Sequence, residues 1–156
     1  MDILDIIKND HDKFLGIFDD METMESKTAD ARDRPFQTLI TELTKHMDAE
    51  EKVFYPALES KHRDDILEAI EEHNVARTVS DQMDNAEKDT DKWMAKLKVF
   101  KELIEHHIEE EEGKIFDEAR KDLSKDRLSD LGREFEDAKA GTMKASRSSA
   151  RAGKAT

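Results

Sequence analysis

Histidine and glutamate recur in this sequence as a set that repeats along the chain. The set contains four histidines and two glutamates: His11, His46, Glu50, His73, His107 and Glu111. The pair His46 and Glu50 returns as His107 and Glu111 at an offset of 61 residues. Imidazole nitrogens and carboxylate oxygens are good ligands for iron, manganese and zinc. Two similar halves that together supply six donors favour two metal ions over one.

Apolar residues surround both histidine–glutamate pairs at helical spacing. Two matching stripes result: Leu39, Leu43, His46, Glu50 and Phe54, then Phe100, Ile104, His107, Glu111 and Ile115. Such a stripe is one face of an α-helix and faces the core. A buried carboxylate or charged imidazole without a partner is costly. A bound cation is therefore the expected compensation.

The composition favours a single helical domain. The chain has 156 residues, of which 42% are charged, with five glycines, two prolines and no cysteine. This profile is typical of a mostly helical protein, and it excludes disulfides and thiolate metal sites. The N-terminal segment carries acids where a secretory signal carries basic residues, and no stretch approaches ~20 apolar residues. We therefore expect a cytoplasmic protein with no membrane partner.

Charge is unevenly distributed along the chain. The net charge is −13, but residues 139–156 contain five basic residues and no acid. An acidic body repels nucleic acid, so we expect no nucleic-acid partner. Residues 140–156 are rich in Ala, Ser and Gly and have no apolar periodicity. This segment is predicted to be a flexible, disordered tail.

The spacing of apolar and turn residues predicts four long helices. They cover about 2–26, 35–60, 63–88 and 90–122, and a shorter fifth helix follows Ser124. We therefore predict an all-α fold, an up-down-up-down four-helix bundle over residues 1–122. An accessory helix over 123–139 and the tail over 140–156 complete the expected organisation.

The histidine spacing agrees with antiparallel helices. Two residues at the same height must be equidistant from the turn that joins their helices. The midpoints between successive histidines of the set are 28.5, 59.5 and 90, and each falls among turn or capping residues. The bundle therefore places all four histidines in one layer, with Glu50 and Glu111 about 6 Å away along the axis.

Such a layer predicts how two ions would share the donors. The two glutamates can bridge ions roughly 3.5–4 Å apart. One ion would take His11 and His46, and the other would take His73 and His107. Six protein donors do not fill two octahedra, so open positions remain for water, oxygen or peroxide.

Four segments of the sequence resemble the hemerythrin-like HHE cation-binding domain family. They are NDHDKF, KHMDAEEKVFYPAL, AIEEHNVAR and HHIEEEEGKIFDEAR, and the resemblance spans roughly residues 1–121. The Glu-x-x-His pattern of ferritin-type sites is absent, because Lys8, Leu43, Ile70 and Ile104 precede the histidines by three positions.

The resemblance implies a four-helix bundle that holds two iron ions, with zinc or manganese as substitutes. Members of the wider family carry or sense oxygen, bind nitric oxide, store iron or decompose peroxide. Oxygen carriers have a fifth histidine where this chain has Arg77. That difference argues against reversible oxygen carriage and favours a more open centre, near which Arg77 would offer donors to peroxide.

These expectations lead to three functional hypotheses. The first is a non-haem di-iron protein that handles peroxide, O2 or NO, with catalase-like activity as the reaction to test. The second is a non-catalytic protein that senses or stores iron. The third is a structural bundle whose polar residues are satisfied without metal.

Residues beside the ligand set have open alternatives. His106 with Glu110 is an alternative to His107 with Glu111, and His62 is interpreted as a surface residue at a turn. Glu51 and Glu72 are candidate partners for imidazole N–H groups. Tyr55 either caps the core or serves as a phenolate ligand or radical trap.

Overall fold

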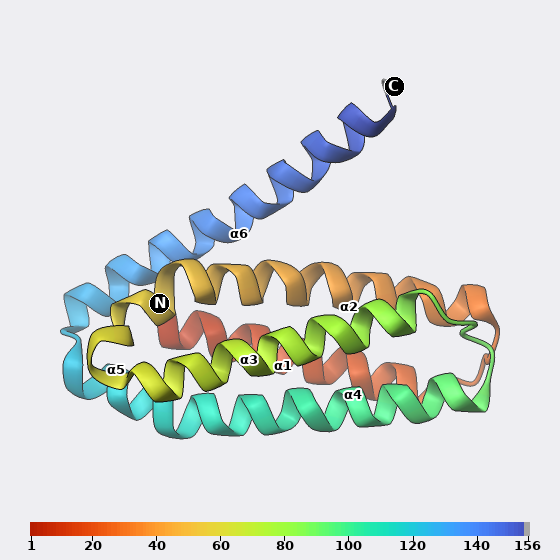
Figure 1. Ribbon diagram of the computed structural model, residues 1–156, viewed down its shortest axis with the longest axis horizontal. Helices are drawn as coiled ribbons and strands as arrows, with labels where there is room; N and C mark the ends of the chain where they lie inside the picture. Colours follow the sequence, from red (N-terminus) through yellow and green to blue (C-terminus); the bar gives the residue numbers. More distant parts are fainter. Residues whose placement is uncertain (155–156) are drawn as a thin grey trace.

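The computed structural model contains a bundle of four long helices in which successive helices run in opposite directions (Figure 1). The bundle helices are α1 (Ile3–Thr23), α2 (Ala29–Ala49), α3 (Glu59–Asp84) and α4 (Asp91–Glu110). The structure describes the backbone of residues 1–154 and the side chains of residues 1–141. The predicted all-α, up-down-up-down bundle is confirmed.

Polar side chains fix where the helices begin. Asp2 caps α1, and its carboxylate and that of Asp5 each accept the backbone N–H of the other residue. Thr28 caps α2 by accepting the N–H of Ala31 at 3.2 Å. The predicted start of α2 at Pro35 is therefore wrong, because the cap starts the helix at Ala29 and leaves Pro35 inside it.

Two π-helical turns interrupt the regular helices at matching places. They are η1 (Glu50–Phe54), which follows α2, and η3 (Glu111–Ile115), which follows α4. In each turn the N–H five residues later bonds to the carbonyl of the glutamate. The 3-10 turn η2 (Tyr55–Ala57) then leads into α3, and α5 (Phe116–Asp122) continues η3. Such turns occur frequently at functional sites.

The core consists of two apolar clusters, one on each side of the histidine layer. One includes Ile7, Phe54, Phe116 and Phe135, and the other includes Phe14, Phe36, Trp93 and Phe100. On α1, His11 lies between Ile7 of the first cluster and Phe14 of the second. Apolar side chains therefore pack against the histidine layer on both of its sides.

The last helix, α6 (Lys125–Lys154), packs against α1, α2 and η1. Its residues Leu128, Leu131 and Phe135 are buried, as the predicted accessory helix requires. Gly132 allows a close approach, because a Cβ there would lie 3.2 Å from the backbone of Asp2 and Ile3.

Beyond its packed portion, α6 leaves the bundle (Figure 1). Its backbone is helical as far as Lys154, and residues 155–156 lie outside the described residues. The flexible tail over 140–156 stays a prediction. Within the part of the chain that the structure describes, no helix has the length and apolarity needed to cross a membrane.

Candidate metal centre

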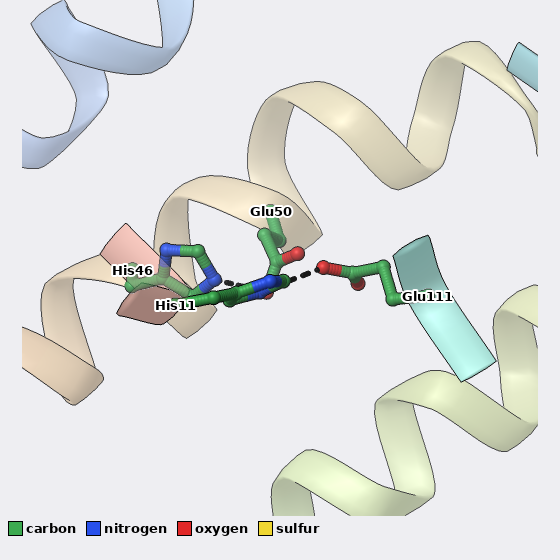
Figure 2. Close-up of side chains that lie close together, drawn as sticks. All are labelled: His11, His46, Glu50 and Glu111. Atoms are coloured by element: carbon green, nitrogen blue, oxygen red, sulfur yellow. Dashed lines mark ion pairs between the residues drawn. The ribbon is translucent and has the colours of Figure 1, made fainter. Parts of the chain in front are cut away.

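The six predicted side chains come together inside the bundle. All six are buried, and both glutamates are fully inaccessible to solvent. Two groups have ligand atoms that all lie within 4.8 Å of one another: His11, His46, Glu50 and Glu111, and Glu50, His73 and His107. Figure 2 shows the first group, with its side chains pointing toward one another. The arrangement is able to hold a metal ion at either group.

Glu50 reaches imidazoles from both halves of the site. Its Oε1 lies 3.0 Å from Nε2 of His46 and 3.2 Å from Nε2 of His73. This carboxylate therefore lies between the imidazoles of α2 and α3.

Glu111 spans the site in the other direction. Its Oε1 lies 3.2 Å from Nε2 of His11, and its Oε2 lies 3.5 Å from Nε2 of His107. Each glutamate thus contacts one imidazole of each helix pair, and together they connect all four imidazoles.

A carboxylate stands behind every imidazole of the set. The four Nδ1 contacts are His11 with Glu112 (2.8 Å), His46 with Asp10 (2.8 Å), His73 with Glu51 (2.8 Å) and His107 with Glu72 (3.0 Å). An ionised carboxylate only accepts hydrogen bonds, so each Nδ1–H donates. Each neutral ring then directs the Nε2 lone pair inward, and such partners are typical of metal-binding histidines.

The pKa values of these four carboxylates keep them ionised. Burial alone would raise the pKa of Asp10 and of Glu51, but their imidazole and cationic neighbours hold each pKa below its ordinary value. For Glu72 and Glu112, the hydrogen bond from the imidazole is the largest influence and lowers the pKa. The imidazole tautomers are therefore fixed by charge.

Several inward-facing atoms have no hydrogen-bond partner among the residues that the structure describes. They are Nε2 of His11, Nε2 of His46, both oxygens of Glu50 and Oε1 of Glu111. Buried polar atoms are almost always satisfied in native proteins. Lone pairs that face one another repel unless a proton or a cation lies between them. The donor set therefore fits metal ions, and the orphaned atoms are where those ions would bind.

Without a cation, protons must compensate the same charges. Burial, with Glu111 nearby, raises the pKa of Glu50 to about 8. Burial would also raise the pKa of Glu111, but Glu50 and the facing imidazoles hold it well below its usual value. Burial opposes charge on His11 and His107, yet their carboxylate partners raise the pKa of both rings. Metal binding must displace these protons.

Tyr55 belongs to the centre rather than only to the core. Its hydroxyl donates to Oε2 of Glu111 at 2.5 Å and lies 3.3 Å from Nε2 of His73. Its ring stacks on that of His73 with centroids 5.5 Å apart. Burial and the adjacent carboxylates raise the pKa of Tyr55 well above its ordinary value. A neutral hydroxyl that donates to a ligand oxygen is the role this geometry describes.

The residues considered as alternative or additional site residues lie outside the group of six donors. His106 and Glu110 are exposed, and the His106 ring lies 3.7 Å from Glu72 rather than among the six donors. Arg77 forms ion pairs with Glu51 and Asp48, and it therefore contacts a carboxylate behind His73 rather than the six donors themselves. His62 lies at a kink in α3 and contacts Glu118 and Asp122, away from the layer.

Glu51 and Glu72 are imidazole partners, as predicted, whereas the roles of Asp10 and Glu112 were not predicted. A signal for the missed pair was present. An acid stands directly before the first histidine of each half, as in Asp10-His11 and Glu72-His73. A second glutamate also follows each buried one, at Glu51 and Glu112. All four outer carboxylates therefore obey the same repeat as the donors.

A small cavity adjoins the donors on the side of the apolar cluster that contains Phe14 and Phe100. It has about 10 Å³ of space for the centre of a water-sized molecule. Most of its wall is apolar and comes from Phe14, Leu43, Met47, Ala76, Leu103, Ile104 and Ile108. A cavity needs roughly 10–15 Å³ on this measure to hold one water, so this space is at the lower limit for a single water-sized molecule.

A comparison with protein families gives an independent match to this architecture. The family described as "Hemerythrin HHE cation binding domain" matches residues 2–119. That range contains all six buried donors and the four carboxylates behind them.

Two individual proteins are similar over most of the chain. A DNA nickase from Nostoc sp. is 25% identical over 141 residues, which are 90% of this chain and 40% of that protein. The chain thus spans two fifths of the length of this relative. The crystal structure of an HHE cation-binding domain-containing protein from Mycobacterium kansasii has a TM-score of 0.80 and 20% identity. The match covers 94% of this chain and 93% of that one.

Proposed function

Since the chain belongs to the hemerythrin HHE cation-binding domain family, we propose that it binds two iron ions between its four helices. The proposed ligands are His11, His46, His73 and His107, with Glu50 and Glu111 as bridges. Mixed nitrogen and oxygen donors with open positions suit iron, and zinc or manganese would substitute. The observation that carries this proposal is the set of orphaned donor atoms facing one another in a sealed core.

The surrounding residues support reactivity toward small oxygen species or nitric oxide. Bound iron would supply electron transfer to O2, peroxide or NO. The apolar cavity beside the donors excludes bulky molecules and provides poor solvation for water. Tyr55 stands on the opposite side and keeps a neutral hydroxyl on Glu111. The protein thus holds its donors still and restricts what reaches them.

Peroxide is the first substrate to test. In disproportionation, two H2O2 give two H2O and one O2, with no other reductant. The experiment adds H2O2 to iron-loaded protein and records O2 with an electrode, with His107→Ala as the inactive comparison. The exposed neighbour variant His106→Ala is the matched control. Sustained O2 release supports catalase-like activity. Bleaching after a few equivalents supports a non-catalytic iron-sensing or iron-storage protein, and a wild-type protein that takes up no iron contradicts both.

Nucleic acid is not among the ligands that we propose. The activity in the name of the Nostoc relative belongs to a protein of which this chain spans 40%. The net charge of −13 repels a phosphate backbone. A filter-binding assay with DNA at physiological salt is expected to give no retention, and saturable retention would contradict this expectation.

A further inference from the structure

One of the four outer carboxylates, Asp10 on α1, has a cation on its far side. Lys139 of α6 places Nζ 3.0 Å from both oxygens of Asp10. Asp10 Oδ2 is also the oxygen that accepts the Nδ1–H of His46 at 2.8 Å. The side chain of Lys139 is only 15% exposed. The lysine therefore draws charge from the same oxygen that supports the imidazole.

The same arrangement occurs on α3. Arg77 places Nη2 2.5 Å from Oε2 of Glu51, and this oxygen accepts the Nδ1–H of His73 at 2.8 Å. The side chain of Arg77 is 30% exposed. A cation, a shared carboxylate oxygen and an imidazole again form one chain of contacts.

Among the side chains of residues 1–141, no cation holds either of the other two carboxylates in this way. Lys8 lies 4.0 Å from Oε1 of Glu112, whereas His11 contacts Oε2, and Lys8 is 57% exposed. His106 lies 3.7 Å from Oε2 of Glu72 and is 63% exposed, whereas His107 contacts Oε1. Both contacts are longer, more solvated and made to the oxygen that the imidazole does not use.

The imidazoles with and without a cation behind them are grouped by the glutamate that they face, not by the helix pair that carries them. His46 and His73, whose outer carboxylates contact the partly buried cations, both face Glu50. The other two imidazoles, His11 and His107, both face Glu111. Two kinds of imidazole therefore alternate around the centre.

A carboxylate that accepts an Nδ1–H bond increases the basicity of a metal-binding imidazole. A charge-assisted bond to that carboxylate withdraws electron density from it and reduces the effect. We propose that Arg77 and Lys139 are positioning residues that make His73 and His46 weaker electron donors than His107 and His11. This inference rests on the proposed metal site. It gives α6 a role at the centre, because its Phe135 ring also contacts His46 with centroids 5.7 Å apart.

Whether removal of Arg77 or Lys139 raises or lowers the metal affinity distinguishes the proposed electronic role from a purely structural one. If Arg77 and Lys139 only hold Glu51 and Asp10 in place, removing them loosens the imidazoles and weakens metal binding. If they withdraw electron density, removing them strengthens the imidazoles and tightens binding. Zn²⁺ is the suitable probe, because it has no redox chemistry and accepts the same donors.

The experiment measures Zn²⁺ affinity of Arg77→Gln and Lys139→Gln by competition with a chelator. We expect binding tighter by roughly tenfold, at the lower end of effects seen for residues behind metal ligands. Arg77→Lys keeps the charge and should stay close to wild type. The matched control is Lys8→Gln, which removes the same charge near Glu112 without a shared oxygen, and it should change affinity less. The reduction potential of the iron-loaded variants should fall below that of wild type, because stronger donors stabilise the oxidised metal.

Weaker Zn²⁺ binding in the two variants, or a change no larger than in Lys8→Gln, would overturn the inference. The two variants lie on different helices, so if one fails to fold, which circular dichroism reports, the other decides the question. A wild-type protein that binds neither Zn²⁺ nor iron would instead overturn the proposed function.

Discussion

The two π-helical turns carry the same buried glutamate but different aromatic residues. Five residues after Glu50 stands Tyr55, and five residues after Glu111 stands Phe116. Tyr55 donates to Glu111 at the centre, whereas the Phe116 ring packs on Phe54 in the core. The repeated backbone supplies a nearly symmetric donor set. Single side chains then give each half of the centre its own chemistry.

The two halves also differ in how they are covered. On the α1–α2 side, His46 packs against Phe14 and against Phe135 of α6, with ring centroids 5.1 Å and 5.7 Å apart. On the α3–α4 side, the rings of His73 and His107 approach to 4.7 Å, and Tyr55 stacks on His73. Two phenylalanine rings therefore pack on an imidazole of the α1–α2 half. In the α3–α4 half, the Tyr55 ring and a closer pair of imidazoles take their place.

Removal of a bridge should break both halves at once, which is the largest effect expected. Glu50→Ala should lose both metals, because Glu50 contacts imidazoles of both halves. His107→Ala should lose the metal of its own half first. Elemental analysis per folded chain measures both losses, with exposed His106→Ala as the control. Retention of two metals per chain in both variants would refute the ligand assignment.

The stability of the metal-free protein should depend on pH, because protons compensate the buried charges of its two halves. The pKa of Glu50 is about 8 when folded, against an ordinary value of 4.5, so the folded state binds the extra proton. Metal-free stability should therefore fall as pH rises from about 5 to 8. The raised pKa values of His11 and His107 act in the same direction, since their contribution is complete below 6.5 and is lost as pH rises.

The lowered pKa of Glu111 has the opposite sign, but its contribution is complete above pH 4.5 and does not alter this slope. Metal affinity should rise by roughly tenfold per pH unit for each proton displaced. Melting temperatures of metal-free and Zn²⁺-loaded protein at pH 6, 7 and 8 measure both trends. A gap between the two temperatures that narrows as pH rises would contradict this reasoning.

Tyr55→Phe should give the chain after η1 the same aromatic residue that follows η3. Glu111 then loses a buried donor, which costs about 2 kcal/mol of unfolding free energy in the metal-free protein. The loss should be much smaller once metal occupies the same carboxylate. Denaturant unfolding with and without Zn²⁺ measures the difference. An equal loss in both states would show that the hydroxyl acts on packing rather than on the ligand.

Gly132→Ala should loosen the α6 cover of the α1–α2 half by the smallest amount. The added Cβ would lie 3.2 Å from the backbone of Asp2, so α6 must shift slightly. We expect about 1 kcal/mol of destabilisation, the lower end for overpacking. Gly141→Ala is the control, because no described atom lies within 4 Å of its Cβ, and alanine there should stabilise the helix. Equal effects of the two substitutions would argue against close packing at Gly132.

The fold and the six-residue cluster could be predicted because both leave periodic signals. Apolar stripes fixed the helices, and equal distances from the turns put His11, His46, His73 and His107 in one layer. The start of α2 was misplaced because Pro35 is a frequent first helical residue, whereas the weaker signal of Thr28 provides the actual cap.

The finer chemistry of the site left weaker signals in the sequence. A π-helical turn adds one residue to a turn without changing residue types, so η1 and η3 could not be predicted from periodicity. Asp10 and Glu112 follow the repeat, but they are two acids among 39 in the chain. Only the packing of α1 against α2 and η3 shows which imidazole each of them contacts. The link from Lys139 to Asp10 spans 129 residues and depends on how α6 docks.

We propose that one helical layer binds a pair of metal ions. The most direct test is the metal stoichiometry of wild-type protein that has been stripped with chelator, reloaded with Fe²⁺ without oxygen and freed of excess metal. Two iron ions per folded chain is the predicted result. A folded protein that retains no iron, or that saturates at a single ion, would contradict the claim.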